Sequence, residues 1–225
     1  MNTQLARLLQ LASPALPVGA YAYSQGLEWA VESGTVCNEV SALTWIGDLL
    51  QWNMARFELP LLAEMLRACN AQDIEQLAEL NIRYLAGRET AELRAESLQM
   101  AYSLVQLLSE LGEGGAPALA LARTLIQPTF PAVWACAAAA WQIEESEALT
   151  AYLWSWIENQ TMAAIKAVPL GQAAGQRIML ALGARIAPAV EAAQSLPLAD
   201  YGNFAPGFAI ACSRHETQYS RLFRS

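Results

Sequence analysis

The chain has 225 residues, of which 55% are hydrophobic and 15% are charged, and its formal net charge is −8. This composition supports a large buried core in one domain and excludes global disorder. An acidic chain without a basic stripe is poorly suited to nucleic acid or an anionic membrane, so we expect neither as a partner.

The first residues carry neither the basic nor the apolar region of a signal peptide, so we expect a cytoplasmic protein. The longest uncharged run, residues 124–143, approaches the length of a membrane span, but its prolines predict two short buried helices instead. One histidine and cysteines without Cys-x-x-Cys spacing predict buried reduced thiols, no metal site and no cofactor. The four cysteines are Cys37, Cys69, Cys136 and Cys212.

Helix signals recur along the chain, whereas hairpin signals and alternating apolar runs are absent from the sequence. Asp73 begins a capping-box pattern, and Pro60 fits the first turn of a helix. We expect one all-α, bundle-like domain of roughly eight to ten helices. The expected helices begin near residues 21–24 and then cover 38–56, 59–70, 77–85, 89–111, 116–126, 132–141, 145–167, 170–194 and 205–215.

A proline-rich turn precedes the first of these helices. Pro14, Pro17 and Gly19 restrict the backbone of this turn, and Tyr21 and Tyr23 follow near the start of the helix. These two tyrosines either pack under the loop with bonded hydroxyls or form an interaction surface. The residues alone leave both interpretations open.

Lys166 is the only lysine, and no acidic residue occurs between Glu158 and Glu191. A cation on so apolar a segment either extends outward along its aliphatic stem or pairs with a distant carboxylate. An outward-pointing structural lysine is the simpler interpretation, and a functional contact is the alternative. Catalysis by Lys166 would require a pKa lowered by burial.

Residues 212–225 differ from an ordinary tail, which is small and polar. Their distinctive members are His215, Tyr219, Arg221, Leu222 and Phe223. Aromatic residues and arginines are enriched at interface hot spots. This tail either folds back onto its own core or docks on a partner. We divide the chain accordingly into a helical domain, residues 1–211, and a partner-binding tail, residues 212–225.

The sequence offers little for catalysis. His215 is the only histidine, and the chain contains neither a nucleophile elbow beside it nor a P-loop. The carboxylates of residues 58–113 are spread as on a solvated helix face. We therefore expect no catalytic residue and no enzyme. A helical enzyme that uses His215 or Lys166, and a generic helical adaptor, remain as alternatives.

Three stretches of the chain resemble the UreF family of urease accessory proteins. They occur in the family's order and in a chain of the family's length, whereas residues 112–144 carry no comparable motif. The matching residues are Leu11–Gly19 with Tyr21, Ser24, Gly26–Glu28 and Gly34; Lys166 with Val168, Pro169, Gly171 and Gln172; and His215–Phe223.

The resemblance implies an all-helical, non-enzymatic scaffold that forms a homodimer. Proteins of this family bind the accessory protein UreD, called UreH in some organisms, and this pair recruits the nickel-carrying GTPase UreG. The assembly docks on apo-urease, and nickel insertion is coupled to GTP hydrolysis and to carbamylation of a urease lysine. The resemblance also implies that the protein regulates when the GTPase acts.

The resemblance further implies roles for individual residues. Tyr21 and Arg221 match positions on the surface that recruits the GTPase, and Lys166 matches a position that controls its activation. The C-terminal segment is expected to become ordered when UreD/UreH binds. Beside these family positions, Tyr219, Leu222 and Phe223 complete the expected partner-binding set.

Overall fold

The computed structural model describes residues 3–225, and every regular element in this range is helical, which confirms the predicted all-α fold. A π-helix and short 3-10 turns accompany α-helices α1 to α12. The α-helices are α1 (Thr3–Leu11), α2 (Leu27–Glu32), α3 (Glu39–Leu49), α4 (Leu59–Ala71), α5 (Ile74–Ala86), α6 (Ala91–Glu110), α7 (Ala116–Ala122), α8 (Phe130–Ala140), α9 (Glu145–Ala167), α10 (Gln172–Gly183), α11 (Ile186–Ser195) and α12 (Pro206–His215).

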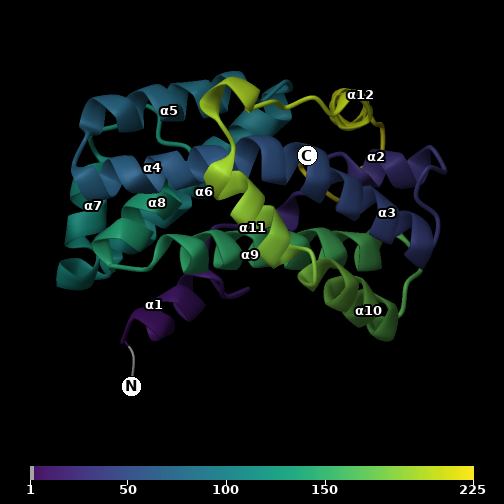
Figure 1. Ribbon diagram of the computed structural model, residues 1–225. Coiled ribbons are helices and arrows are strands. Elements are labelled where there is room, and N and C mark those ends of the chain that lie inside the picture. The colour runs from purple at the N-terminus through teal and green to yellow at the C-terminus, as the bar shows by residue number, and fades with distance from the viewer. Residues whose placement is uncertain (1–2) are drawn as a thin grey trace.

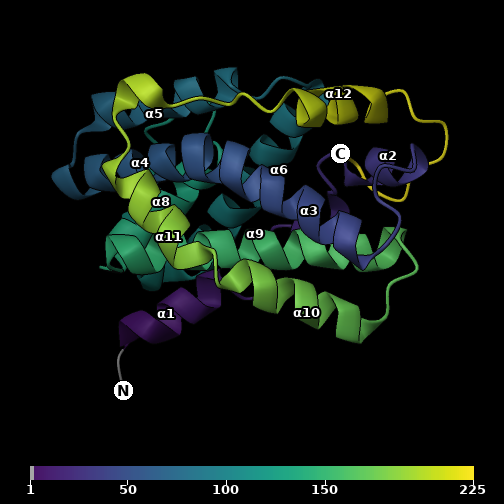
Figure 2. The same ribbon diagram turned by 45° about the vertical axis from the view of Figure 1, so that its right-hand side comes forward.

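The longest helix, α9, runs across the molecule and organises the packing (Figure 1). Helices α1, α2, α3, α4, α10 and α11 all contact it. A second group forms around α8, which packs against α4, α6 and α7. In both ribbon views α12 lies beside α2, and the C-terminus ends close to them, far from α1 (Figure 2).

Helix α8 is almost entirely buried, because alanine side chains let its neighbours approach closely. No helix within residues 3–225 is both long enough and apolar enough to span a membrane. The four cysteines are free, and Cys69 and Cys136 bring their sulfur atoms to 3.8 Å across the α4–α8 contact. The expectation that all four thiols are buried is wrong for Cys37, which is exposed just before α3.

A nine-residue π-helix, Leu50–Glu58, joins α3 to α4 without a break. Pro60 lies in the first turn of α4 as predicted, where a missing N–H is tolerated, but the expected separation of residues 38–56 from 59–70 is bridged by the π-helix. π-helical turns are rare and frequently occur at functional sites. This π-helix directs the carboxylate of Glu58 into the protein interior, where Arg88 pairs with it.

The sequence predicts one helix over residues 170–194, whereas the structure has two, α10 and α11. Pro188 lies in the first turn of α11 and has no N–H to donate to the preceding turn. The helix is therefore interrupted just before it. Asp73 caps α5 as predicted, because its side chain accepts a hydrogen bond from the N–H of Gln76 at 3.0 Å.

Candidate interaction site

The tail folds back from α12 through a series of turns and bends and lies against α2. The carboxylate of Glu28 accepts the N–H groups of Leu222 and Phe223, at 2.6 and 3.0 Å. The N–H of Arg224 donates to the carbonyl of Ala22 at 2.8 Å. Glu28 is itself only 8% exposed; its bond to Phe223 is buried and its bond to Leu222 is partly buried. Hydrogen bonds to a carboxylate contribute about 1.5–3 kcal/mol each.

The tail ends in a second set of hydrogen bonds between α2 and α6. The carbonyl of Ser225 accepts the hydroxyl of Ser24 at 2.6 Å and the N–H groups of Ser24 and Gln25 at 2.8 and 3.1 Å. The hydroxyl of Ser225 and the side-chain amide of Gln25 both donate to Glu96, at 2.6 and 2.7 Å. Burial raises the pKa of Glu96 to about 7, although these two hydrogen bonds act in the opposite direction.

His215 lies between two carboxylates where α12 meets the tail. The ring is fully buried, with Nδ1 at 2.7 Å from Glu92 and Nε2 at 3.2 Å from Glu28. Arg221 also pairs with Glu92, so one carboxylate holds both side chains.

Lys166, in the last turn of α9, lies against two aromatic rings. Its Nζ is 5.7 Å from the ring centroid of Tyr21 and 5.8 Å from that of Phe223. Cation–π contacts of this kind contribute about 0.5–1 kcal/mol at exposed sites. The three stretches singled out in the sequence therefore meet at one place in the fold.

The structure places the other predicted site residues around this cluster. Arg221 is exposed apart from its ion pair, and the side chains of Tyr219 and Leu222 extend into solvent. Phe223 differs from them, because it is buried with only 6% of its surface exposed. The tail is thus folded back, as one of the two alternatives proposed, and it also presents an apolar edge. The boundary at residue 212 and the ordering of the tail on binding stay predictions.

Sequence reasoning missed the acids that hold the tail. Glu92 and Glu96 were expected on a solvated helix face, which is wrong for Glu96 because this side chain is buried beneath Ser225. Glu58 is also buried, since it pairs with Arg88 at 2.6 Å. A helical carboxylate gives no local sign that a distant segment will cover it. Only Glu28, which lies in a stretch that resembles the UreF family, carried any signal.

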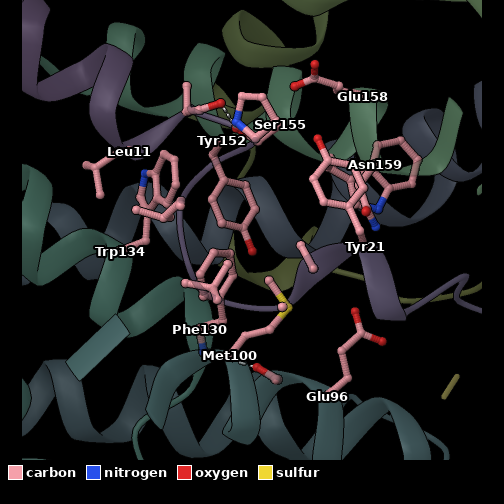
Figure 3. A pocket seen from close by; sticks show the side chains of 18 of the residues that line it. Leu11, Tyr21, Glu96, Met100, Phe130, Trp134, Tyr152, Ser155, Glu158 and Asn159 are labelled. Atoms are coloured by element: carbon pink, nitrogen blue, oxygen red, sulfur yellow. Dashed lines mark hydrogen bonds between the residues drawn. The ribbon is translucent and has the colours of Figure 1, made fainter. Parts of the chain in front are cut away.

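A cavity of about 420 Å³ adjoins the cluster on the side of Tyr21. Figure 3 shows Trp134, Phe130 and Tyr152 on one side of this cavity and Tyr21 on the other, with Met100 between them. The proline-rich turn contributes to its lining, as do helices α6, α8 and α9. Tyr152 donates to Glu58 at 2.5 Å, which links the cavity wall to the buried ion pair.

Among residues 3–225, no group of three or more His, Cys, Asp or Glu side chains is placed to hold a metal ion. The site is instead an exposed surface of cationic, aromatic and apolar side chains on a rigid helical body. This fold and this site define an all-α protein with a candidate protein-binding surface. Residues 36–183 match the family model of UreF. The chain belongs to the UreF family.

Comparison with curated proteins agrees with this assignment along nearly the whole chain. The chain is 61% identical over 223 residues to the urease accessory protein UreF of Azoarcus sp. (strain BH72), covering 98% of this chain and 95% of that protein. It is 57% identical over 223 residues to the urease accessory protein UreF of Dechloromonas aromatica (strain RCB), covering 99% and 98%. The corresponding protein of Methylobacillus flagellatus is 55% identical over 224 residues, covering 100% and 99%.

Proposed function

We propose that this protein is a cytoplasmic, non-enzymatic urease accessory protein that is required for nickel insertion into apo-urease. It acts as a homodimeric scaffold that binds UreD/UreH, recruits the GTPase UreG and regulates GTP hydrolysis. Family membership supports the general role in urease maturation. The proposed binding of these partners and regulation of the GTPase are supported by one observation: Tyr21, Lys166 and the tail, which are distant in the sequence, lie together in the fold.

Apolar and cationic side chains of this site have different proposed partners. Tyr219 and Leu222 are 105% and 73% exposed, so they are available as anchors for UreD/UreH without any change in the fold. Phe223 supports them from below and becomes available to a partner only if the tail moves. In this proposal, partner binding favours the ordered tail, because the free energy gained at the interface compensates for the entropy lost on ordering.

Arg221 and Lys166 supply the cations for the GTPase. Arg221 bonds Glu92 and the carbonyl of His215 through Nη1, so the rest of its planar donor fork faces outward toward carboxylates or carbonyls of a partner. Lys166 stands on a fixed helix end between the rings of Tyr21 and Phe223, which restricts the directions in which its ammonium can reach. This restricted reach suits a contact that controls GTPase activation.

We expect Arg221→Ala to weaken recruitment of UreG about ten- to a hundredfold, because one or two charge-assisted hydrogen bonds are lost. The measurement is a pull-down of UreG by the complex of this protein with UreD, with thermal melts of wild type and variant. Arg214→Ala is the matched control, since Arg214 is an exposed arginine in the last turn of α12. Undiminished recruitment would remove Arg221 from the site, and a collapsed melting temperature would make its role structural.

The alternatives make different predictions. An enzyme that uses His215 would need substrate to reach a ring that is fully buried between two carboxylates. A generic helical adaptor would leave urease activity unchanged when the gene is deleted. Deletion in a urease-positive host, followed by an assay of nickel-dependent urease activity, distinguishes this adaptor from the proposed accessory protein, which predicts a loss of activity.

A further inference from the structure

The cavity beside Tyr21 is partly open to solvent between the proline-rich turn and helices α6, α8 and α9. Interiors are packed as densely as organic crystals, and an engineered cavity of about 150 Å³ is sufficient to bind benzene. Sites for small molecules begin at about 300 Å³. The volume of about 420 Å³ therefore has room for a molecule of one or two fused rings.

The walls of the cavity are suited to a flat, apolar guest. Trp134 and Tyr152 pack edge to face with their ring centroids 5.2 Å apart, and Phe130 lies 5.8 Å from Tyr152. Met100 projects between these rings and Tyr21 (Figure 3). Aromatic rings favour stacked or edge-to-face neighbours, and a thioether adapts to such contacts.

Three buried polar atoms in this lining have no hydrogen-bond partner among the described residues. They are the donors Trp134 Nε1 and Arg88 Nε and the acceptor Asn159 Oδ1. Each of these residues is at most 8% exposed, and unpaired polar atoms are costly at such burial. All three atoms are themselves closed off from solvent, so a guest that carries one hydroxyl or N–H group pairs with one of them only when the lining side chains shift.

The charges around the cavity select against an anion. Glu58, Glu96 and Glu158 contribute to its lining, and the single arginine there, Arg88, is already paired with Glu58. Burial raises the pKa of Glu96 to about 7 and also raises that of Glu158. The burial that disfavours ionisation of these acids also disfavours a bound anion, whereas it does not penalise a neutral molecule in this way.

We propose that this cavity is a binding site for a neutral, planar aromatic molecule of one or two rings that carries a hydroxyl or N–H group. The ring system lies among Phe130, Trp134 and Tyr152, with Met100 against it. After a shift of the lining side chains, the polar group pairs with the acceptor Asn159 Oδ1 or with the unpaired donors. This site adjoins the tail, because Tyr21, Gln25 and Glu96 take part in both.

The test uses three probes of the same shape, measured by calorimetry or ligand-observed NMR on the isolated full chain. We expect 2-naphthol to bind. 2-Methylnaphthalene should bind about tenfold more weakly, because it cannot make the hydrogen bond, and the anion 2-naphthoate should bind at least tenfold more weakly. Failure of 2-naphthol to bind the wild-type protein would overturn the proposal.

Two variants locate the probe. Met100→Trp fills the cavity and should abolish binding of 2-naphthol, whereas Tyr102→Trp places the same side chain on the exposed face of α6 and should leave it unchanged. Asn159→Leu removes the acceptor and should reduce the preference for 2-naphthol over 2-methylnaphthalene. Unchanged binding by a folded Met100→Trp protein would contradict the site; if that protein does not fold, an unchanged preference in Asn159→Leu would do so.

The same chemistry could reach the cavity as a free molecule or as an aromatic side chain of a partner. This last measurement rests on the proposed function, but the binding tests above do not. If saturating 2-naphthol lowers capture of UreD/UreH, the natural guest is a side chain of that partner. If capture is unchanged, the guest is a free small molecule.

Discussion

Glu28 joins three parts of the chain through one buried carboxylate. It accepts the N–H groups of Leu222 and Phe223 and contacts Nε2 of His215. Together with Glu92 and Glu96 it forms an acidic receptor for the tail, built on α2 and α6. Acids in this arrangement serve the fold through their partners, since each would be costly if it remained buried and unpaired.

The titration of Glu96 makes the stability of the protein depend on pH. Its pKa is about 7 in the folded protein and 4.5 as the reference value, so the unfolded chain loses this proton first as the pH rises. The contribution of Glu96 to the free energy of unfolding therefore decreases as the pH rises from 4.5 to about 7. Between pH 5.5 and 7.5 we expect its contribution to the free energy of unfolding to fall by about 2 kcal/mol.

Urea unfolding of wild type and Glu96→Gln at both pH values measures this effect. The variant should gain stability relative to wild type as the pH is raised, because glutamine does not ionise. Glu75→Gln, an exposed substitution in the first turn of α5, should follow the wild-type pH dependence. Parallel curves for wild type and Glu96→Gln would show that Glu96 does not titrate in this range.

At the scale of elements, the contact between α2 and α12 depends on a glycine. Gly26 caps α2 with φ of 75°, and a Cβ atom there would lie 2.9 Å from the backbone nitrogen of Cys212. Because α12 leads directly into the tail, this close approach also positions the tail. Gly26→Ala should therefore strain the backbone and push α12 away.

We expect Gly26→Ala to lower the free energy of unfolding by about 2–5 kcal/mol, the sum of left-handed strain and overpacking. Gly34→Ala is the matched control, because Gly34 has φ of 77° but open space around it. The control should cost only the strain, about 1–2 kcal/mol. Equal losses in chemical unfolding would show that the α2–α12 approach contributes nothing to stability.

Local signals in the sequence predict the helices better than they predict the site. The bounds of α9 follow from the stop at Val168 and Pro169, and the cap at Asp73 marks the start of α5. The division between α10 and α11 was missed because the helical periodicity continues past Pro188. Among site residues, Tyr21, Lys166 and Arg221 were found through resemblance. The receptor acid Glu96 was not, because its burial depends on Ser225, which is 129 positions away.

At the scale of the whole molecule, the tail connects the end of α9 to α2 and α6 on one side of the helical body. Lys166 contacts Phe223, Glu28 holds the tail backbone, and Arg221 bonds Glu92 on α6. A partner that binds the exposed edge of the tail is therefore connected through the tail to α9, α2 and α6. If UreD/UreH binds as proposed, this arrangement lets that binding stabilise the surface proposed for the GTPase.

Hydrogen exchange measures this coupling. We expect the N–H groups of Leu222, Phe223 and Arg224 to exchange more slowly in the complex with UreD/UreH than in the free protein, because the partner opposes opening of the tail. Helix α8, which is buried in the body of the protein, provides the internal reference. Equal protection of the tail in both states would mean that it belongs to the native core independently of the partner.

The pairing of Ser24 with Ser225 also imposes an order on biosynthesis. The two residues are 201 positions apart, so residues 24 to 28 leave the ribosome long before the segment that covers them. During that interval the carboxylates of Glu28 and Glu96 have no tail donors, and the body can assemble only with this receptor open to water. A nascent chain stalled before residue 221 would therefore present an accessible receptor, to which a tail supplied on a separate peptide could bind.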